Sequence, residues 1–318
     1  MDVLVSAHAF ERFGGVFGPA GGDDVRWLEV DADTSIDPDA IEVGWMSADL
    51  FYSGLLDRFF GLLRDAPGLR WVQSAAAGTD GPWFSPLIER GIRLSTSHVN
   101  DVPIAEYVLA MVLRHYQRPD EWAAAQAERA WRHHEFREIS GTTWLIVGLG
   151  AIGRGVAERA RPFGTRVIGV RRGPDGTEPV DVMVGPDDVP AALPEADVVV
   201  LSRPGDAAEP PIVDAAFLAA MKPGAVLVNV ARGSLVDEPA LLAALDAGIP
   251  EHAILDVFAT EPLPPDSALW HHPRVTVTPH SANGGTGRYR RAAELFAENL
   301  ANYRAGRPLR NEIARAPS

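Results

Sequence analysis

Cysteine is absent from the 318-residue sequence. Disulfide bonds, thiolate metal sites and cysteine nucleophiles are therefore excluded. The nine histidines do not suggest another metal site: His133-His134 and His271-His272 are adjacent pairs whose side chains diverge, and no His-Glu-x-x-His spacing occurs. A strand-associated Gly-x-Ser-x-Gly elbow of a serine hydrolase is also lacking. We expect no metal in this protein.

Long hydrophobic runs are missing too, since no stretch reaches about 18 consecutive apolar residues. The first ten residues lack the basic segment and apolar stretch of a signal peptide, so we expect no membrane partner and a cytoplasmic location. Basic residues are few: the sequence has 29 lysines and arginines and 43 aspartates and glutamates, which gives a net charge of −14. Such a chain repels nucleic acid, and any anion site needs local arginines and backbone N–H groups.

The composition that is present is that of a folded protein, with 46% hydrophobic and 23% charged residues. A length of 318 residues exceeds a typical single core and indicates two domains. The glycine-rich stretch Gly14–Gly22 does not lie between a strand and a helix, so we interpret it as a surface loop.

Apolar β-branched segments alternate with helical ones, which is typical of parallel sheets covered by helices on both faces. The expected strands are Asp2–Ser6, Val43–Met46, Arg70–Ser74, Arg93–Ser95, Trp144–Val147, Val167–Val170, Val198–Leu201, Val226–Val230, Ala253–Val257 and Val275–Thr278. The expected helices include Pro103–His115, Pro119 to about Trp131, Arg154–Phe163 and Thr286–Tyr303. The pattern predicts an α/β fold with a doubly wound sheet in the second half.

One glycine turn has the full context of a dinucleotide site, because the strand 143–147 enters it and a helix follows. Gly148 permits the tight turn, Gly150 lets the backbone approach a pyrophosphate, and Gly153 lets the helix pack closely on the strand. Ala151 and Ile152 lie at the helix N-terminus, where free N–H groups and a partial positive charge face the phosphates. A ligand-free turn is the alternative interpretation.

Arg171 occupies the position at the end of the second strand where NAD enzymes carry Asp or Glu, and Arg172 follows it. A carboxylate there would bind the ribose hydroxyls and repel a 2′-phosphate, whereas two guanidinium groups offer charge-assisted hydrogen bonds to it. The pair predicts NADP(H) in preference to NAD(H). The alternative is that both arginines are solvated loop residues.

Three polar segments, 229–233, 256–263 and 278–282, each follow one of the late strands. The carboxyl ends of parallel strands share one edge of a sheet, where ligands bind. An arginine, a carboxylate and an imidazole from these segments are therefore expected in one site.

With these motifs, the chain resembles the D-isomer-specific 2-hydroxyacid dehydrogenase family over essentially its whole length, in particular its glyoxylate/hydroxypyruvate reductase members. The resemblance rests on the glycine turn, the stretch Leu218–Leu245 with its Ala-Arg-Gly-Ser-Leu-Val-Asp-Glu run, the Asp-Val-Phe-x-x-Glu-Pro-Leu run from Asp256, and Thr278-Pro279-His280.

The resemblance implies that Arg232 clamps the substrate's carboxylate and 2-oxo oxygen, since a planar guanidinium matches both acceptors. His280 would protonate the substrate oxygen and act as the base in reverse. Glu261 would hydrogen-bond His280 and orient it. Taken singly, each residue has an ordinary alternative: a packed histidine, a turn-capping glutamate, or an arginine paired with Asp237 or Glu238.

The remaining contacts are also carried over from the family. The nicotinamide would lie against Val230, Ala231, Asp256 and Ala282. The family usually has a threonine-bearing turn after strand 198–201, and this chain departs from it, which leaves Ser202 and Pro204 as adenosine-side contacts. The substrate carboxylate would meet backbone N–H groups of the loop Ala76-Ala77-Gly78, where Ala76 replaces a common glycine.

The family's architecture implies two doubly wound domains, with a Rossmann nucleotide domain inserted into a flavodoxin-like substrate domain. Residues 1–99 and 284–318 would form the discontinuous substrate domain, and residues 100–283 the dinucleotide-binding domain. Catalysis is expected where the two meet, with closure excluding water.

The family also implies a homodimer, and the apolar face of Ile104–Val112 is consistent with a two-fold contact or with ordinary core. The expected function is reduction of a small 2-oxo acid, glyoxylate or hydroxypyruvate, by NADPH. Glu261 argues against formate-oxidising relatives, which pair the histidine with glutamine. The alternative is a nucleotide-sensing, corepressor-like protein on the same fold.

Overall fold

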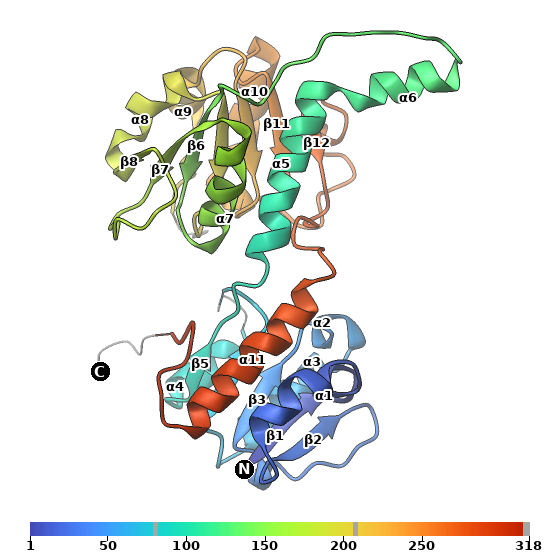
Figure 1. Cartoon of the computed structure of the whole chain (residues 1–318), viewed down its shortest axis with the longest axis vertical. Coiled ribbons are helices and arrows are strands. Elements are labelled where there is room, and N and C mark those ends of the chain that lie inside the picture. The colour runs from blue at the N-terminus through green and yellow to red at the C-terminus, as the bar shows by residue number, and fades with distance from the viewer. Residues whose placement is uncertain (79–81, 206–208, 314–318) are drawn as a thin grey trace. The chain divides into compact units, whose positions relative to one another are not determined.

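The computed structural model describes residues 1–78, 82–205 and 209–313. The chain forms two compact units (Figure 1). The first unit comprises Met1–Asn100 and Thr286–Ser318, and the second comprises Asp101–Gly285. Each contains one parallel sheet with helices around it, so the predicted α/β class with two parallel sheets is confirmed.

The sheet of the first unit has five parallel strands in the order β2-β1-β3-β4-β5. This is the flavodoxin-like order. The strands are β1 (Asp2–Ser6), β2 (Arg26–Val30), β3 (Val43–Met46), β4 (Trp71–Ser74) and β5 (Arg93–Ser95). Strand β2 was not predicted, because it lies at the sheet edge and its sequence Arg-Trp-Leu-Glu-Val mixes charged residues with apolar ones.

Helix α1 (Ala7–Gly21) corrects the prediction of a loop at Gly14–Gly22. Glycine disfavours a helix by about 1 kcal/mol relative to alanine, which is why this stretch looked like a loop. Tertiary packing outweighs that preference: Phe17 is fully buried, and its ring centroid lies 5.6 Å from that of Phe296. Phe296 belongs to α11 (Arg288–Arg304), which packs along α1, so the two ends of the chain share one core (Figure 1).

Three shorter helices complete the first unit: α2 (Leu50–Ser53), α3 (Leu56–Asp65) and α4 (Phe84–Glu89). The chain beyond α11 returns to the sheet edge. There Ser95 forms a β-bridge with Glu312, and Arg93 Nε lies 2.7 Å from the Glu312 carboxylate.

The sheet of the second unit has seven parallel strands in the order β12-β11-β10-β9-β6-β7-β8. The strands are β6 (Thr143–Val147), β7 (Arg166–Val170), β8 (Val182–Val184), β9 (Val198–Leu201), β10 (Val226–Asn229), β11 (His252–Leu255) and β12 (Val275–Val277). Counted from β6, this is the Rossmann order 3-2-1-4-5-6 with a seventh strand added. The order reverses between β6 and β9, where such sheets bind ligands. Strand β8, three residues at the edge of the sheet, was not predicted.

The helices of the second unit are α5 (Asp101–Gln117), α6 (Pro119–Ala127), α7 (Ala151–Ala160), α8 (Val189–Ala192), α9 (Ala215–Ala220) and α10 (Glu238–Ala247). The apolar face of α5 is buried within the unit: Ala105, Val108 and Val112 are fully buried in a core shared with α7. The face that suggested a dimer contact is therefore ordinary core.

Among the helices that the structure describes, none is long and apolar enough to cross a membrane.

Candidate active site

The glycine turn joins β6 to α7, and each of its glycines has a different structural role. Gly148 has a φ of 104°, and a Cβ there would lie 2.5 Å from the backbone nitrogen of Arg203. A Cβ on Gly153 would lie 2.0 Å from the Gly148 carbonyl oxygen. A Cβ on Gly150 would meet no atom within 4 Å. Two glycines thus permit close packing, and the third faces open space.

The N-terminus of α7 has no side-chain cap, because Gly150 occupies the N-cap position. Within the described residues, the backbone N–H groups of Ala151 and Ile152 have no acceptor, and the first turn closes only at Arg154 N, which donates to Gly150 O. Free N–H groups at a helix N-terminus attract an anion. The turn therefore fits the diphosphate of a dinucleotide.

A cavity of about 510 Å³ adjoins this turn. Five predicted cofactor residues line it: Gly148, Gly150, Arg171, Arg172 and Pro204. Leu149, inside the predicted glycine turn, also lines it. The sequence analysis missed Pro186, Val189, Glu209 and Ile212, which line it from two other segments that carry no motif, so only the fold identifies them.

Ser202 does not line that cavity. It is 8% exposed, and its hydroxyl donates to the Gly148 carbonyl at 2.7 Å. The contact fastens the glycine turn to the end of β9. Val230, Ala231 and Ala282 are buried as well, with exposed fractions of 4–6%.

The His280–Glu261 pair joins the segment after β12 to the segment after β11. Nδ1 of His280 is 2.7 Å from Oε2 of Glu261, and the other carboxylate oxygen accepts the backbone N–H of Phe258 at 3.0 Å. Glu261 therefore caps a turn and also holds the imidazole. With Nδ1 committed to the carboxylate, Nε2 is the nitrogen available to exchange a proton. The His280 side chain is 47% exposed, so a substrate can reach it.

Asp256 holds the loop that carries His280. Its Oδ1 accepts the Thr278 hydroxyl at 2.6 Å and the Ser281 N–H at 2.8 Å, and its Oδ2 accepts the Ala282 N–H at 2.9 Å. Its backbone carbonyl accepts the His280 N–H at 2.8 Å. Asp256 is only 2% exposed, so the structure shows it as the anchor of this loop.

Tyr107 supports the same loop and was missed by the sequence analysis. Its hydroxyl lies 2.6 Å from the Thr278 hydroxyl. Burial raises the pKa of Tyr107 to about 12, so the group stays an uncharged hydrogen-bonding hydroxyl at neutral pH. Tyr107 is on α5, far from this loop in sequence, and no local motif marks it.

Arg232 follows β10, the strand next to β11, and β11 in turn pairs with β12. Topology therefore brings Arg232 and the segments of Asp256 and His280 to the same sheet edge. Asn229 shapes the turn by donating to the Arg232 carbonyl at 2.9 Å. A Cβ on Gly233 would lie 1.8 Å from the Phe258 carbonyl carbon, so the two loops pack directly together.

The two acidic residues considered as partners of Arg232 have structural contacts elsewhere. Asp237 caps α10 by accepting the Ala240 N–H at 3.0 Å. Glu238 accepts the Ala259 N–H at 2.8 Å. Both contacts stabilise the loops around the site.

A second cavity, of about 400 Å³, opens beside His280. It is lined by Phe258, Glu261, Pro262, Leu263, Trp270, Pro279 and His280. Apart from the Glu–His pair its walls are apolar, so this space favours an uncharged group next to the imidazole.

The predicted substrate loop Ala76-Ala77-Gly78 follows β4 in the first unit. The N–H of Ala76 already donates to Ser74 Oγ at 3.0 Å, and its carbonyl accepts Ser97 N–H at 2.9 Å. Of the three residues, Ala77 and Gly78 keep N–H groups that no described residue accepts.

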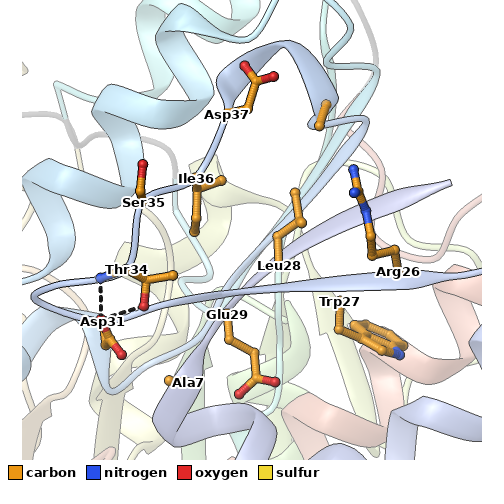
Figure 2. A pocket seen from close by; sticks show the side chains of 11 residues that line it. Ala7, Arg26, Trp27, Leu28, Glu29, Asp31, Thr34, Ser35, Ile36 and Asp37 are labelled. Carbon is orange, nitrogen blue, oxygen red and sulfur yellow. Dashed lines mark hydrogen bonds between the residues drawn. The ribbon is translucent and has the colours of Figure 1, made fainter.

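Another hollow of the first unit, about 460 Å³, lies beside β2 (Figure 2). Asp31 lines this hollow, and its carboxylate accepts hydrogen bonds from the backbone N–H groups of Asp33 and Thr34 at 2.8 and 2.7 Å. None of the predicted site residues lines it. Across the described ranges, no group of three or more His, Asp or Glu is arranged to hold a metal ion.

The strand order and the free amides at the switch point place the second unit in the class of dinucleotide-binding domains. Comparison with known families narrows the class. A family model described as "D-isomer specific 2-hydroxyacid dehydrogenase, NAD binding domain" matches residues 109–282, more than half of the chain. The chain belongs to the D-isomer specific 2-hydroxyacid dehydrogenase family, and the predicted resemblance is confirmed.

Individual relatives agree with this assignment. A glyoxylate/hydroxypyruvate reductase A from Serratia proteamaculans is 37% identical over 177 residues, which cover 56% of this chain and 56% of that protein. The match thus spans little more than half of the relative's length. A family member from Aeromonas salmonicida has a TM-score of 0.83 at 28% identity and covers 99% of both chains. A family member from Xanthobacter autotrophicus, solved with NADPH and MES, has a TM-score of 0.75 at 29% identity and covers 99% of this chain and 98% of that one.

Proposed function

We propose that the protein reduces a small 2-oxo acid, glyoxylate or hydroxypyruvate, to the 2-hydroxy acid with NADPH. The observation that carries the proposal is the 2.7 Å contact between His280 Nδ1 and Glu261 Oε2, because it leaves Nε2 as a proton donor at a sheet edge where ligands bind. The Serratia relative's name supports the substrate, and the NADPH in the Xanthobacter structure supports the cofactor.

In this proposal Arg232 binds the substrate's carboxylate and 2-oxo oxygen with its planar guanidinium and polarises the C2 carbonyl. The bound nicotinamide supplies the hydride to C2. His280 donates the Nε2 proton to the oxygen, which becomes the hydroxyl, and Glu261 stabilises the imidazole and keeps it oriented. The reverse reaction uses His280 as the base.

The N–H groups at the start of α7 are the proposed donors to the cofactor diphosphate, with Gly148, Gly150 and Gly153 giving access. Arg172 and Pro204 are assigned to the adenosine end, with Arg171 and Ser202 supporting the loops beside it, and Val230, Ala231, Asp256 and Ala282 are assigned to the nicotinamide end. Ala77 and Gly78 are the proposed backbone donors to the substrate carboxylate. The first unit is accordingly proposed as the substrate domain and the second as the dinucleotide-binding domain.

We also propose a homodimer. Since the apolar face of α5 is buried within the chain, the surface for it lies on residues 119–138, where Trp131 is fully exposed and Trp122 and Phe136 are 38% and 45% exposed. Exposed aromatic residues close together in sequence are typical of interfaces.

The test is NADPH oxidation by a panel of small 2-oxo acids that includes glyoxylate, hydroxypyruvate, pyruvate and oxaloacetate. We expect turnover with glyoxylate or hydroxypyruvate, and a higher kcat/KM with NADPH than with NADH. Tight NADPH binding without oxidation by any 2-oxo acid would instead support the nucleotide-sensing alternative. A higher kcat/KM with NADH would contradict the cofactor assignment.

A further inference from the structure

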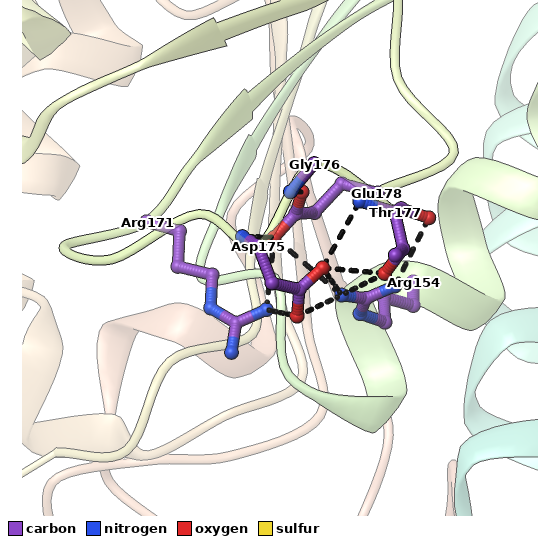
Figure 3. Close-up of polar contacts among 6 residues, drawn as sticks. All are labelled: Arg154, Arg171, Asp175, Gly176, Thr177 and Glu178. Atoms are coloured by element: carbon purple, nitrogen blue, oxygen red, sulfur yellow. Dashed lines mark hydrogen bonds and ion pairs between the residues drawn. The ribbon is translucent and has the colours of Figure 1, made fainter.

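The loop after β7 is closed around a carboxylate (Figure 3). Glu178 accepts the backbone N–H of Asp175 with Oε1 and that of Gly176 with Oε2, both at 2.9 Å. The Glu178 side chain is only 2% exposed. Gly176 makes this fold-back possible because its φ is 80°, a conformation that side-chain-bearing residues rarely adopt. The loop therefore brings its own acidic groups to the end of β7.

Arg171 is bound to these acidic groups. Its Nη1 lies 3.0 Å from Glu178 Oε1 and 3.3 Å from Asp175 Oδ2. To contact a ligand phosphate instead, Arg171 would have to leave a carboxylate whose side chain is only 2% exposed. Removing one member of such a pair leaves the other without compensation.

Arg154 completes the network from the first turns of α7. Its Nη2 lies 3.0 Å from Asp175 Oδ2, and its Nη1 donates to the Thr177 carbonyl at 3.3 Å. Two guanidinium groups thus face two carboxylates, and their charges cancel. Both acids stay ionised at neutral pH: the Thr177 hydroxyl lowers the pKa of Asp175 to about 2, and the Asp175 N–H lowers the pKa of Glu178.

Arg172 differs from its neighbour. It is exposed, and it makes no hydrogen bond or ion pair with any residue that the structure describes. It lines the same cavity as Gly148 and Gly150. Arg203, a third arginine in that cavity, is paired with Glu209 at 3.3 Å. Arg172 can therefore bind an anion there without breaking a contact to any described residue.

We propose that the two adjacent arginines have different functions. Arg172 is the specificity-determining residue that binds the 2′-phosphate of NADPH, and Arg171 is a positioning residue that, with Arg154, holds the loop closed and so presents Arg172 to the cavity. This inference rests on the proposed use of NADPH, and it assigns the discrimination between NADPH and NADH to the side chain of Arg172.

The test measures binding of 2′,5′-ADP and 5′-AMP by calorimetry, because these probes differ at the 2′-phosphate and need no turnover. Arg172→Gln is expected to weaken 2′,5′-ADP binding about 10- to 100-fold, the loss of charge-assisted hydrogen bonds, and to leave 5′-AMP unchanged. Arg171→Gln is expected to weaken 2′,5′-ADP binding too, because the loop no longer presents Arg172, and to leave 5′-AMP unchanged. Unlike Arg172→Gln, it should also lower the Tm. Arg171→Lys, which keeps a charge for Glu178, should recover part of both losses.

Arg274→Gln is the matched control, since Arg274 is exposed and does not line the cavity. A selective loss of 2′,5′-ADP binding in Arg171→Gln with none in Arg172→Gln would overturn the proposal. Equal affinity of the unaltered protein for both probes would also overturn it. If the protein reduces no 2-oxo acid but Arg172→Gln still loses 2′,5′-ADP selectively, the proposed reaction fails and this inference stands.

Discussion

Nδ1 of His280 lies 2.7 Å from Oε2 of Glu261, and His280 holds this contact from a left-handed backbone conformation with a φ of 51°. A residue with a Cβ adopts this conformation at a cost of about 1–2 kcal/mol. The hydrogen bonds from the loop to Asp256 offset that cost. The imidazole is therefore positioned from two sides, by its side-chain partner and by its backbone.

His280→Ala is expected to lower kcat by roughly two to four orders of magnitude, because the proton donor to the substrate oxygen is lost. NADPH binding should remain close to normal, since the glycine turn is separate from this residue. Steady-state kinetics and fluorescence titration measure the two quantities. His271→Ala, at another exposed histidine of the second unit, is the control, and a near-normal kcat in His280→Ala would remove His280 from its proposed role.

Arg232→Lys is expected to reduce kcat/KM for the 2-oxo acid about 10- to 100-fold. Lysine keeps the charge but cannot bind carboxylate and carbonyl oxygens with one planar group. The dissociation constant for NADPH should not change. A variant with normal kcat/KM would show that Arg232 only shapes the loop, and Arg274→Lys serves as the control for a surface Arg-to-Lys change.

Gly150→Ala and Gly153→Ala are expected to fail in different ways. At Gly150 the added methyl meets no atom within 4 Å, so the Tm should stay the same. The methyl would nevertheless block the approach of the diphosphate and so weaken NADPH binding. At Gly153 the methyl would lie 2.0 Å from the Gly148 carbonyl oxygen, so the Tm should fall together with binding. Thermal unfolding and NADPH titration separate the two, and unchanged NADPH binding in Gly150→Ala would contradict the assignment of the turn.

Acid is expected to destabilise the second unit through His252. Burial lowers the pKa of this residue to about 3, and burial also lowers the pKa of His115, whose ring stacks on it at 4.3 Å. The unfolded histidine has a pKa of about 6.5, so between these values the unfolded chain binds a proton that the folded chain excludes. Stability is therefore constant above about pH 6.5 and falls below it.

The free energy of unfolding should drop by about 1–2 kcal/mol between pH 7 and pH 5 through His252, and His115 acts in the same direction. Urea unfolding at several pH values measures this, and His252→Gln should flatten the dependence. The same slope in His252→Gln as in the unaltered protein would assign the acid sensitivity to other groups.

The proposed dimer predicts that Trp131→Ser weakens self-association at least about 10-fold, because a fully exposed tryptophan is the strongest candidate anchor on residues 119–138. Analytical ultracentrifugation over a concentration series measures the constant. Phe163→Ser, at a half-exposed aromatic of the same unit, is the control. A monomeric protein at all concentrations, or an unchanged constant in Trp131→Ser, would contradict the proposal.

Local sequence patterns predicted most of the second unit, because apolar strands such as Val198–Leu201 alternate with turns that carry clear signals. The patterns failed where packing outweighed them. Helix α1 contains several glycines and Pro19, and it forms because Phe17 packs against α11 from the other end of the chain. No window of sequence around Gly14–Gly22 contains that contact.

The sequence by itself determined where the glycine turn lies and singled out Arg232, Glu261 and His280 as candidates, because those signals depend on spacing within short segments. Only the tertiary structure decided which of two adjacent arginines is available to a ligand. Arg171 and Arg172 look equivalent in the sequence, but the loop folds back through Gly176 and places Glu178 against Arg171 alone. The pairing of charges depends on that three-dimensional path, and residue order does not encode it locally.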